Sequence, residues 1–258
     1  MYPVLIHLGS FTLYTYGVLL ALAFVLGTMW SLWRARHAGL DETFVLLLVG
    51  LVILCGMVGA RLLYVAYFPD LYAADPMRIL TDRGGLVWYG GVMGGLVGGL
   101  LTIRLSGQWP NLLKLLDLMS APLVLGLAIG RLGCFASGCC YGHPTTMPWG
   151  VQFPPGHVTH PLVLHPTQLY ESAAALLLLA LLVGMTGLDG RKQAWPGQAT
   201  AVFLAGYGLI RFTLEFFRGD VVWWVAHVLS ASQVISLLAI GLAGVVWWCN
   251  RQNGCNQQ

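Results

Sequence analysis

The sequence predicts an all-α integral membrane protein with seven membrane-spanning helices. The chain has 258 residues, of which 57% are hydrophobic and only 9% are charged, whereas a soluble domain carries about 25% charged residues. The apolar residues also form long runs, and about 20 consecutive apolar residues are what a helix needs to cross a bilayer. Seven such runs with short connections use most of the chain, so we expect a single polytopic membrane domain over residues 1–258.

Short polar or Pro/Gly-containing segments separate the apolar runs and give the limits of the expected helices. The runs are residues 14–33, 44–67, 86–105, 112–130, 166–187, 198–217 and 223–248. The long segment of about 131–165 is expected to lie outside the membrane. No positively charged segment and small-residue cleavage site mark a signal peptide, so the first run is expected to be a retained helix.

Glycines recur at a spacing of four in the third apolar run. The two series are Gly90, Gly94, Gly98 and Gly91, Gly95, Gly99. This spacing is typical of small residues that let two helices approach closely in lipid. A phosphate-binding glycine loop would instead follow a strand and open a soluble helix. We therefore expect packing for Gly94 to Gly99, whereas Gly90 and Gly91 fit either role.

The basic residues predict an N-terminus outside the cell and a C-terminus in the cytoplasm, because cytoplasmic helix ends are rich in Lys and Arg. One set of ends carries basic residues mostly without acidic neighbours: Arg34, Arg36, Arg104, Lys114, Arg191, Lys192 and Arg251. At the opposite ends, Arg78 and Arg83 have acidic neighbours, and the other arginines lie mostly at or inside helix ends. The 131–165 segment is then extracytoplasmic.

Three arginines lie in or beside apolar runs, where a charge needs a partner or a watery cavity. An arginine at the bilayer centre costs about 2.5–3.5 kcal/mol on the insertion scale. Arg211 shares a helix face with Tyr207 and Glu215, which are spaced four residues to either side. Arg131 directly follows the fourth run, and Arg61 lies in the second.

The simpler explanations for these arginines are an Arg211–Glu215 ion pair and interfacial anchoring of Arg131 and Arg61. The functional explanation is a cationic site. Guanidinium groups bind phosphate bidentately and stay charged, so a cluster of them at head-group level suggests a phospholipid phosphate as the ligand.

Six short motifs along the chain resemble, in the same order, the motifs of one known protein family. The three clearest are GRLGCFASGCCYG (130–142), HPTQLYE (165–171) and YGLIRFTLEFFRGD (207–220). Weaker matches are YTYG (14–17), GAR (59–61) and GGLVWYGG (84–91). Together they resemble the prolipoprotein diacylglyceryl transferase family over nearly the whole chain.

The resemblance implies a transferase of the bacterial cytoplasmic membrane with its active site towards the periplasm. The family moves diacylglyceryl from phosphatidylglycerol to the cysteine thiol of a prolipoprotein signal peptide and releases glycerol phosphate. Membrane lipids are the other expected partners, and no cofactor or nucleic acid is expected. The expected catalytic residues are Arg131, Arg211, Tyr89 and Tyr207. The expected substrate-binding residues are Tyr16, Arg61, Gly90, Gly91, Gly142, Glu215 and Gln168.

The chain departs from the family pattern at three of these motif positions. Cys134 stands where the family usually has Asn, Cys139 where it has Glu, and Tyr89 where it has a His. Because tyrosine and histidine differ by several pK units, either the base lies elsewhere or the arginines activate the thiol. This pattern indicates a divergent, cysteine-containing branch. The alternatives are a different acceptor with the same lipid donor, or a non-catalytic lipid-binding protein.

Cys134, Cys139 and Cys140 allow four interpretations. A disulfide from Cys134 to Cys139 or Cys140 suits an oxidising outer compartment, and packed free thiols are the second possibility. A metal site with His143 is less expected, because the spacing is not a standard zinc pattern, and covalent catalysis is less expected still. We therefore expect no metal.

The HPTQLYE motif fits a helix start, since Pro166 suits the first helical position and an acid such as Glu171 suits that end. Capping alone would explain it. The resemblance instead makes Gln168, Tyr170 and Glu171 supports of the active site.

Overall fold

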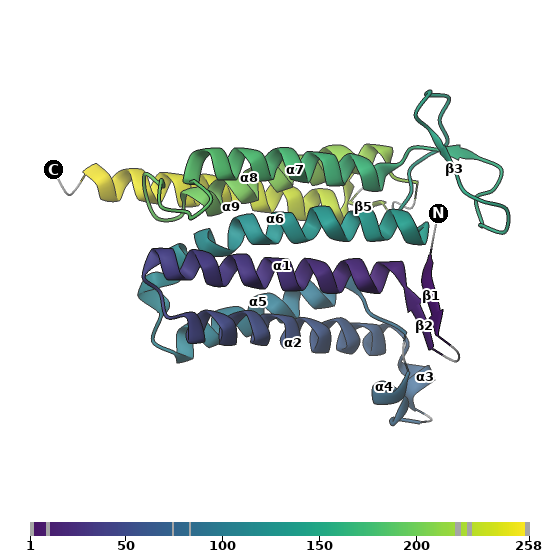
Figure 1. The fold of residues 1–258 in the computed structure, drawn as a ribbon, viewed down its shortest axis with the longest axis horizontal. Helices are drawn as coiled ribbons and strands as arrows, with labels where there is room; N and C mark the ends of the chain where they lie inside the picture. The colour runs from purple at the N-terminus through teal and green to yellow at the C-terminus, as the bar shows by residue number, and fades with distance from the viewer. Residues whose placement is uncertain are drawn as a thin grey trace. The chain divides into compact units, whose positions relative to one another are not determined.

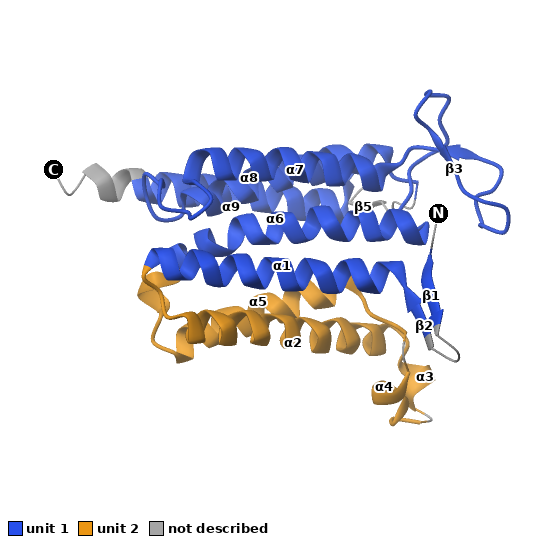
Figure 2. Ribbon diagram, in the orientation of Figure 1, with its two compact units in different colours: residues 1–38, 113–258 blue, residues 39–112 orange. Residues whose placement is uncertain are grey.

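The computed structural model describes residues 3–8, 11–73, 75–82, 84–219, 223–225 and 229–255. Arg83 and Asp220, two residues of the predicted helix ends and motifs, lie outside the described residues, as does the side chain of Arg251. The chain divides into two compact units, residues 1–38 with 113–258 and residues 39–112 (Figure 2).

Six helices among the described residues are long and apolar enough to cross a membrane. Their spans are Thr15–Ala38, Glu42–Tyr67, Trp109–Ser137, Thr167–Thr186, Gln198–Phe217 and Ala231–Asn250. Only 11% to 44% of the most apolar window of each span is buried within the protein. The remaining apolar surface needs lipid around it, so the chain is a mostly helical membrane protein.

Most of the expected helices are found close to their predicted limits. They are α1 (Thr15–Ala38), α2 (Glu42–Tyr67), α5 (Trp88–Leu105), α6 (Leu112–Ser137), α7 (Thr167–Thr186), α8 (Gln198–Leu214) and α9 (Ala231–Cys255). The described residues also form short helices: α3 (Pro69–Ala73), α4 (Arg78–Thr81), η1 (Trp109–Asn111) and η2 (Glu215–Phe217). Helix α5 is not among the six candidate spans, because six glycines dilute its apolar residues.

The prediction of an all-α chain with a helix from residue 223 is wrong in detail. The described residues form three two-stranded antiparallel ribbons: β1 (Val4–Leu8) with β2 (Phe11–Tyr14), β3 (Val151–Gln152) with β4 (Val163–Leu164), and β5 (Trp223–Val225) with β6 (Leu229–Ser230). Helix α9 therefore begins at Ala231. Valine and tryptophan favour strands, and a count of apolar residues does not separate a strand from a helix.

In the first unit, α8 packs against α7 and α9, and α6 joins the same core (Figure 1). The buried core residues of these helices are Ala121, Val124, Ala128, Ala175, Leu178, Leu182 and Ala199. Four of the seven are alanine, and small residues at helix contacts allow close backbone approach in lipid. This close packing fixes the ends of α6, α7 and α8 relative to one another.

A buried carboxylate connects α6 to the start of α8. Asp117 on α6 is 1% exposed. It accepts hydrogen bonds from the backbone N–H of Gly197 at 2.5 Å and of Thr200 at 2.8 Å, and from the Thr200 hydroxyl at 2.8 Å. The first N–H groups of a helix have no partner within the helix, so Asp117 caps α8 from another helix.

Arg34 corrects one part of the orientation argument. We predicted it as a charge in a connecting segment, but α1 continues to Ala38 and Arg34 is 1% exposed. Its guanidinium donates to the carbonyl of Leu118 at 3.2 Å. Arg34 is therefore part of the packing between α1 and α6 and carries no weight as a topology signal.

In the second unit, glycines bring α2 and α5 into close contact, as the spacing of four predicted. A Cβ built on Gly94 would fall on the carbonyl oxygen of Cys55, and one on Gly98 would lie 2.5 Å from the Cys55 Cβ. Gly90 belongs to the same contact, because its Cβ would fall on the carbonyl oxygen of Gly59. The packing prediction is confirmed and extends to Gly90.

Candidate active site

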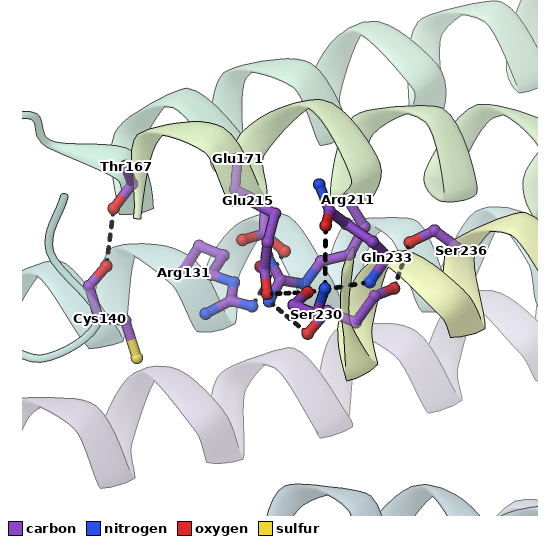
Figure 3. A network of polar contacts seen from close by, with 10 residues as sticks. Arg131, Cys140, Thr167, Glu171, Arg211, Glu215, Ser230, Gln233 and Ser236 are labelled. Atoms are coloured by element: carbon purple, nitrogen blue, oxygen red, sulfur yellow. Dashed lines mark hydrogen bonds and ion pairs between the residues drawn. The ribbon is translucent and has the colours of Figure 1, made fainter. Parts of the chain in front are cut away.

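Arg211 and Glu215 form the ion pair that their spacing predicted. The guanidinium Nη2 of Arg211 lies 2.7 Å from the Glu215 carboxylate, and both side chains are largely buried. Two serines at the start of α9 contact this pair: Arg211 donates to the hydroxyl of Ser232 at 2.9 Å, and the Ser230 hydroxyl donates to Glu215 at 2.5 Å. Glu215, expected to bind substrate, is therefore the direct partner of Arg211 (Figure 3).

Arg131 has its own buried carboxylate. Its Nη2 atom lies 2.9 Å from Glu171 of α7, with the two side chains 15% and 4% exposed. Glu171 does not cap α7, since no acid lies in the first turn and Pro166 takes the N-cap position without a side-chain hydrogen bond. The capping explanation of Glu171 is wrong, because this carboxylate balances the charge of Arg131 instead.

Tyr207 joins the two ion pairs into one cluster. It lies one turn before Arg211 on α8, interacts with Arg131 and Arg211, and is close to Glu171. Figure 3 shows Arg131, Glu171, Glu215 and Arg211 side by side in one polar network. Two guanidinium groups and two carboxylates give the cluster a balanced charge, which reduces the cost of placing each charge in the membrane.

Each arginine of the cluster keeps one buried N–H available. Within the described residues, the Nε atom of Arg131 and the Nη1 atom of Arg211 have no hydrogen-bond partner. A buried donor without an acceptor costs free energy. An anion that reaches the cluster would therefore find one donor on α6 and another on α8.

Gly142 lets the segment that follows α6 pack closely against η2, which directly follows α8. Its N–H donates to the carbonyl of His165 at 2.9 Å, and the next N–H, from His143, donates to Phe217 at 2.9 Å. A Cβ at Gly142 would fall on the Phe217 carbonyl oxygen. Close backbone packing thus accounts for this glycine, and its role in substrate binding stays a prediction.

The thiols of Cys134, Cys139 and Cys140 lie together at the end of α6. All three are free in the structure, and their sulfur atoms lie within 4.8 Å of one another. Hydrogen bonds with the Cys134 and Cys139 thiols lower the pKa of Cys140, whereas hydrogen bonds with Cys134 and Cys140 raise the pKa of Cys139. The predicted disulfide stays a prediction.

Gln168 and Thr167 hold the backbone of this cysteine segment from the start of α7. Gln168 is buried and donates to the carbonyl of Cys139 at 2.5 Å. Thr167 donates to the carbonyl of Cys140 at 2.7 Å. The amide of Gln168 therefore positions the cysteine segment, in line with the supporting role that the resemblance implied, while its expected contact with substrate stays a prediction.

Tyr16 lies beside the same end of α6. A Cβ at Gly133 would be 3.0 Å from a ring carbon of Tyr16, so the glycine makes room for the ring. Tyr16 is also near Arg131 and Cys134, and its side chain is partly exposed. The structure thus brings Tyr16, Arg131, Tyr207, Arg211 and the cysteines together in one unit.

The remaining predicted site residues belong to the second unit. Arg61 on α2 donates to the carbonyl oxygens of four residues: Arg78, Ile79, Gly84 and Gly85. Its guanidinium also lies 5.4 Å from the ring centroid of Tyr72. These contacts tie residues 78–79 and 84–85 to α2. Tyr89 and Gly91 lie in the first turn of α5 with Gly90. The substrate contacts expected for Arg61, Tyr89, Gly90 and Gly91 stay predictions.

A serine and a glutamine at the start of α9 belong to the site, although the sequence motifs did not single them out. Ser230 and Gln233 form a capping box: the Gln233 N–H donates to the Ser230 hydroxyl at 3.2 Å, and the Ser230 N–H donates to the Gln233 side chain at 3.0 Å. The signal was present, since Ser-x-x-Gln before an apolar run is typical of a helix start. The box also positions Ser230 against Glu215.

The fold and the site together define a multi-helix membrane protein with a buried cationic cluster. The family model of prolipoprotein diacylglyceryl transferase matches residues 3–249. The chain is similar to proteins named phosphatidylglycerol–prolipoprotein diacylglyceryl transferase from several bacteria. It is 35% identical to that of Clostridium tetani over 93% of this chain and 94% of the relative. It is 33% identical to the protein of Synechocystis sp. over 95% of this chain and 88% of the relative. It is also 33% identical to the protein of Parasynechococcus marenigrum over 97% of this chain and 94% of the relative.

The chain belongs to the prolipoprotein diacylglyceryl transferase family. It is therefore a membrane transferase of lipoprotein biosynthesis, and the resemblance inferred from its motifs is confirmed.

Proposed function

We propose that this protein transfers the diacylglyceryl group of phosphatidylglycerol to the cysteine thiol of a prolipoprotein signal peptide. The thiolate sulfur attacks the glyceryl carbon that carries the phosphate ester. A carbon–sulfur bond forms, the carbon–oxygen bond to phosphate breaks, and glycerol phosphate leaves. The thiol proton is released, so the products are a thioether-linked lipid and glycerol phosphate. The family and the names of the full-length relatives support both substrates.

The observation that carries the proposal is the pair of buried guanidinium groups with available donors. Arg131 and Arg211 are each held by a carboxylate and each keep one buried N–H without a partner among the described residues. Charge grows on the phosphate as it leaves, and preorganised donors stabilise such charge strongly where water is excluded. The same cations favour the thiolate form of an acceptor cysteine.

The other residues of the cluster position these arginines or contact the substrates. Glu171 and Glu215 orient Arg131 and Arg211, and Tyr207 contacts the phosphate or passes a proton. Tyr16, Gln168 and Gly142 shape the same end of the unit for substrate. Arg61, Tyr89, Gly90 and Gly91 supply further substrate contacts, with Tyr89 in place of the family's histidine. This last feature and the cysteine trio make the chain a divergent branch.

The proposed membrane topology places the active site at the outer face of the bacterial cytoplasmic membrane. Helix α5 is 18 residues long and packs along α2 through its glycines, which supports it as a seventh span. Seven spans place the N-terminus outside and the C-terminus in the cytoplasm. The segment of about 131–165 is then periplasmic, as the basic residues predict.

The test is a reaction of purified protein with labelled phosphatidylglycerol and a synthetic lipobox peptide, followed by mass analysis. We expect a peptide heavier by one diacylglyceryl group and an equal amount of glycerol phosphate. A peptide with Ser in place of its Cys is the matched control and should stay unmodified. Glycerol phosphate release without peptide modification would contradict the proposed acceptor, and no turnover with either peptide would contradict transfer.

A further inference from the structure

The three thiols at the end of α6 have the geometry of a metal site. The sulfur atoms of Cys134, Cys139 and Cys140 all lie within 4.8 Å of one another, and those of Cys139 and Cys140 are 3.6 Å apart. A zinc–sulfur bond is about 2.3 Å long, so thiolates around tetrahedral zinc are about 3.8 Å apart. The Cys139–Cys140 separation of 3.6 Å is close to this value, and no pair of the three sulfurs is more than 4.8 Å apart.

The backbone around the cysteines is fixed in this arrangement. Gln168 and Thr167 hold the carbonyl groups of Cys139 and Cys140 at 2.5 and 2.7 Å. The N–H of Cys139 donates to the carbonyl of Cys134 at 3.2 Å, which links the helix end to the segment that follows. Three ligands are therefore held near their final positions before an ion binds, which reduces the entropy that binding would cost.

The charges around the cluster suit a thiolate-bound dication. Three thiolates and one divalent ion carry a net charge of −1. Arg131 and Arg218 are the cations that act on Cys140, and they would stabilise this anionic complex. The thiolate donor set also selects the metal, because soft sulfur ligands favour ions such as Zn²⁺ over Mg²⁺ and Ca²⁺.

We propose that Cys134, Cys139 and Cys140 form a three-thiolate site for Zn²⁺, with the fourth position taken by a ligand from outside this trio. His143 is not that ligand by geometry, since the group of donors close enough to share an ion comprises only the three cysteines among the described residues. Cys139 is exposed and the other two thiols are half-buried, so an ion has access. Zinc binding at this site is a property separate from diacylglyceryl transfer, and it does not depend on any step of that reaction.

Metal content tests this site independently of transferase activity. The full-length protein without a histidine tag is purified in detergent, reduced with a phosphine, incubated with Zn²⁺ and desalted. We expect one zinc per chain in the wild type and in Cys55→Ser, the matched control on α2. Cys134→Ser and Cys139→Ser should lose stoichiometric zinc. With Co²⁺ in place of zinc, the wild type should show thiolate-to-cobalt charge-transfer absorption that both variants lose.

A second measurement keeps the test valid if a cysteine variant fails to fold. In the wild-type protein, Zn²⁺ should protect Cys134, Cys139 and Cys140 from iodoacetamide, while Cys55 alkylates at the same rate with and without zinc. Peptide mass analysis reads each position separately. Unprotected cysteines, absence of bound zinc, or a disulfide among the three in protein isolated without reductant would each overturn the proposal.

Discussion

The guanidinium of Arg131 on α6 lies 2.9 Å from the carboxylate of Glu171 on α7. Both side chains are largely buried, so the pair holds the arginine in a fixed direction between two packed helices. Breaking a buried pair by removing one partner leaves the other charge uncompensated. The orientation of Arg131 and the stability of the α6–α7 contact therefore depend on the same carboxylate.

Glu171→Gln should reduce stability as well as transfer. Gln keeps the shape of the side chain but removes its charge, and loss of one partner of a buried pair costs about 3–5 kcal/mol. Thermal unfolding in detergent and the transfer rate are the two measurements. Asp75→Asn is the control, because Asp75 and Arg78 form an ion pair with side chains 57% and 52% exposed, and exposed pairs contribute about 0–1 kcal/mol. Equal unfolding temperatures for the two variants would contradict the assigned role of Glu171.

Asp117→Asn should destabilise the start of α8. The carboxylate accepts from two backbone N–H groups and a hydroxyl, and an amide would direct its own N–H₂ at one of these donors. Loss of a helix cap costs about 0.5–2 kcal/mol, and burial of Asp117 places the expected cost at the upper end. Asp41→Asn is the matched control, since Asp41 accepts a single bond from the Thr43 N–H at α2 and Asn caps equally well. Thermal unfolding that ranks Asp41→Asn as the more damaging change would refute this account.

Gly94→Val should disrupt the packing of α2 against α5. A Cβ at this position would fall on the Cys55 carbonyl oxygen and lie 3.0 Å from the Cα atom of Gly59, so the helices must separate. Overpacking costs about 1–3 kcal/mol, and a backbone neighbour cannot rotate away. Gly50→Val is the control on α2, because no described atom lies within 4 Å of a Cβ there. The measurement is the detergent unfolding temperature, and a Gly94→Val protein as stable as Gly50→Val would argue against close glycine packing.

The helices were predictable because each is an apolar run bounded by polar residues. The predicted helix limits were wrong where an apolar segment forms a strand, because hydropathy does not distinguish a strand from a helix. Residues Trp223–Val225 form a strand and α9 starts only at Ala231, although the apolar run begins at residue 223. The Ser-x-x-Gln pattern of residues 230–233 is present in the sequence and predicts the start of α9 correctly.

The candidate site was predictable only where its geometry is local. Arg211 and Glu215 lie four residues apart, so the helix itself brings them together. The Arg131–Glu171 and Asp117–Thr200 contacts depend on how α6 packs against α7 and α8, and residue spacing along the chain does not reveal that packing. Arg34 shows the same limit, because its position near a helix end suggested a solvated charge while packing against α6 buries it.

The central claim is that the arginine cluster stabilises the leaving phosphate during diacylglyceryl transfer. The most direct measurement is the transfer rate of Arg211→Ala at saturating phosphatidylglycerol, in protein shown to be folded by size exclusion and thermal unfolding. Removal of one such donor costs about 10²–10³ in kcat, so we expect a loss of that size. Arg104→Ala, which changes an exposed arginine at the end of α5, should retain wild-type kcat. Normal turnover by a folded Arg211→Ala protein would contradict the claim.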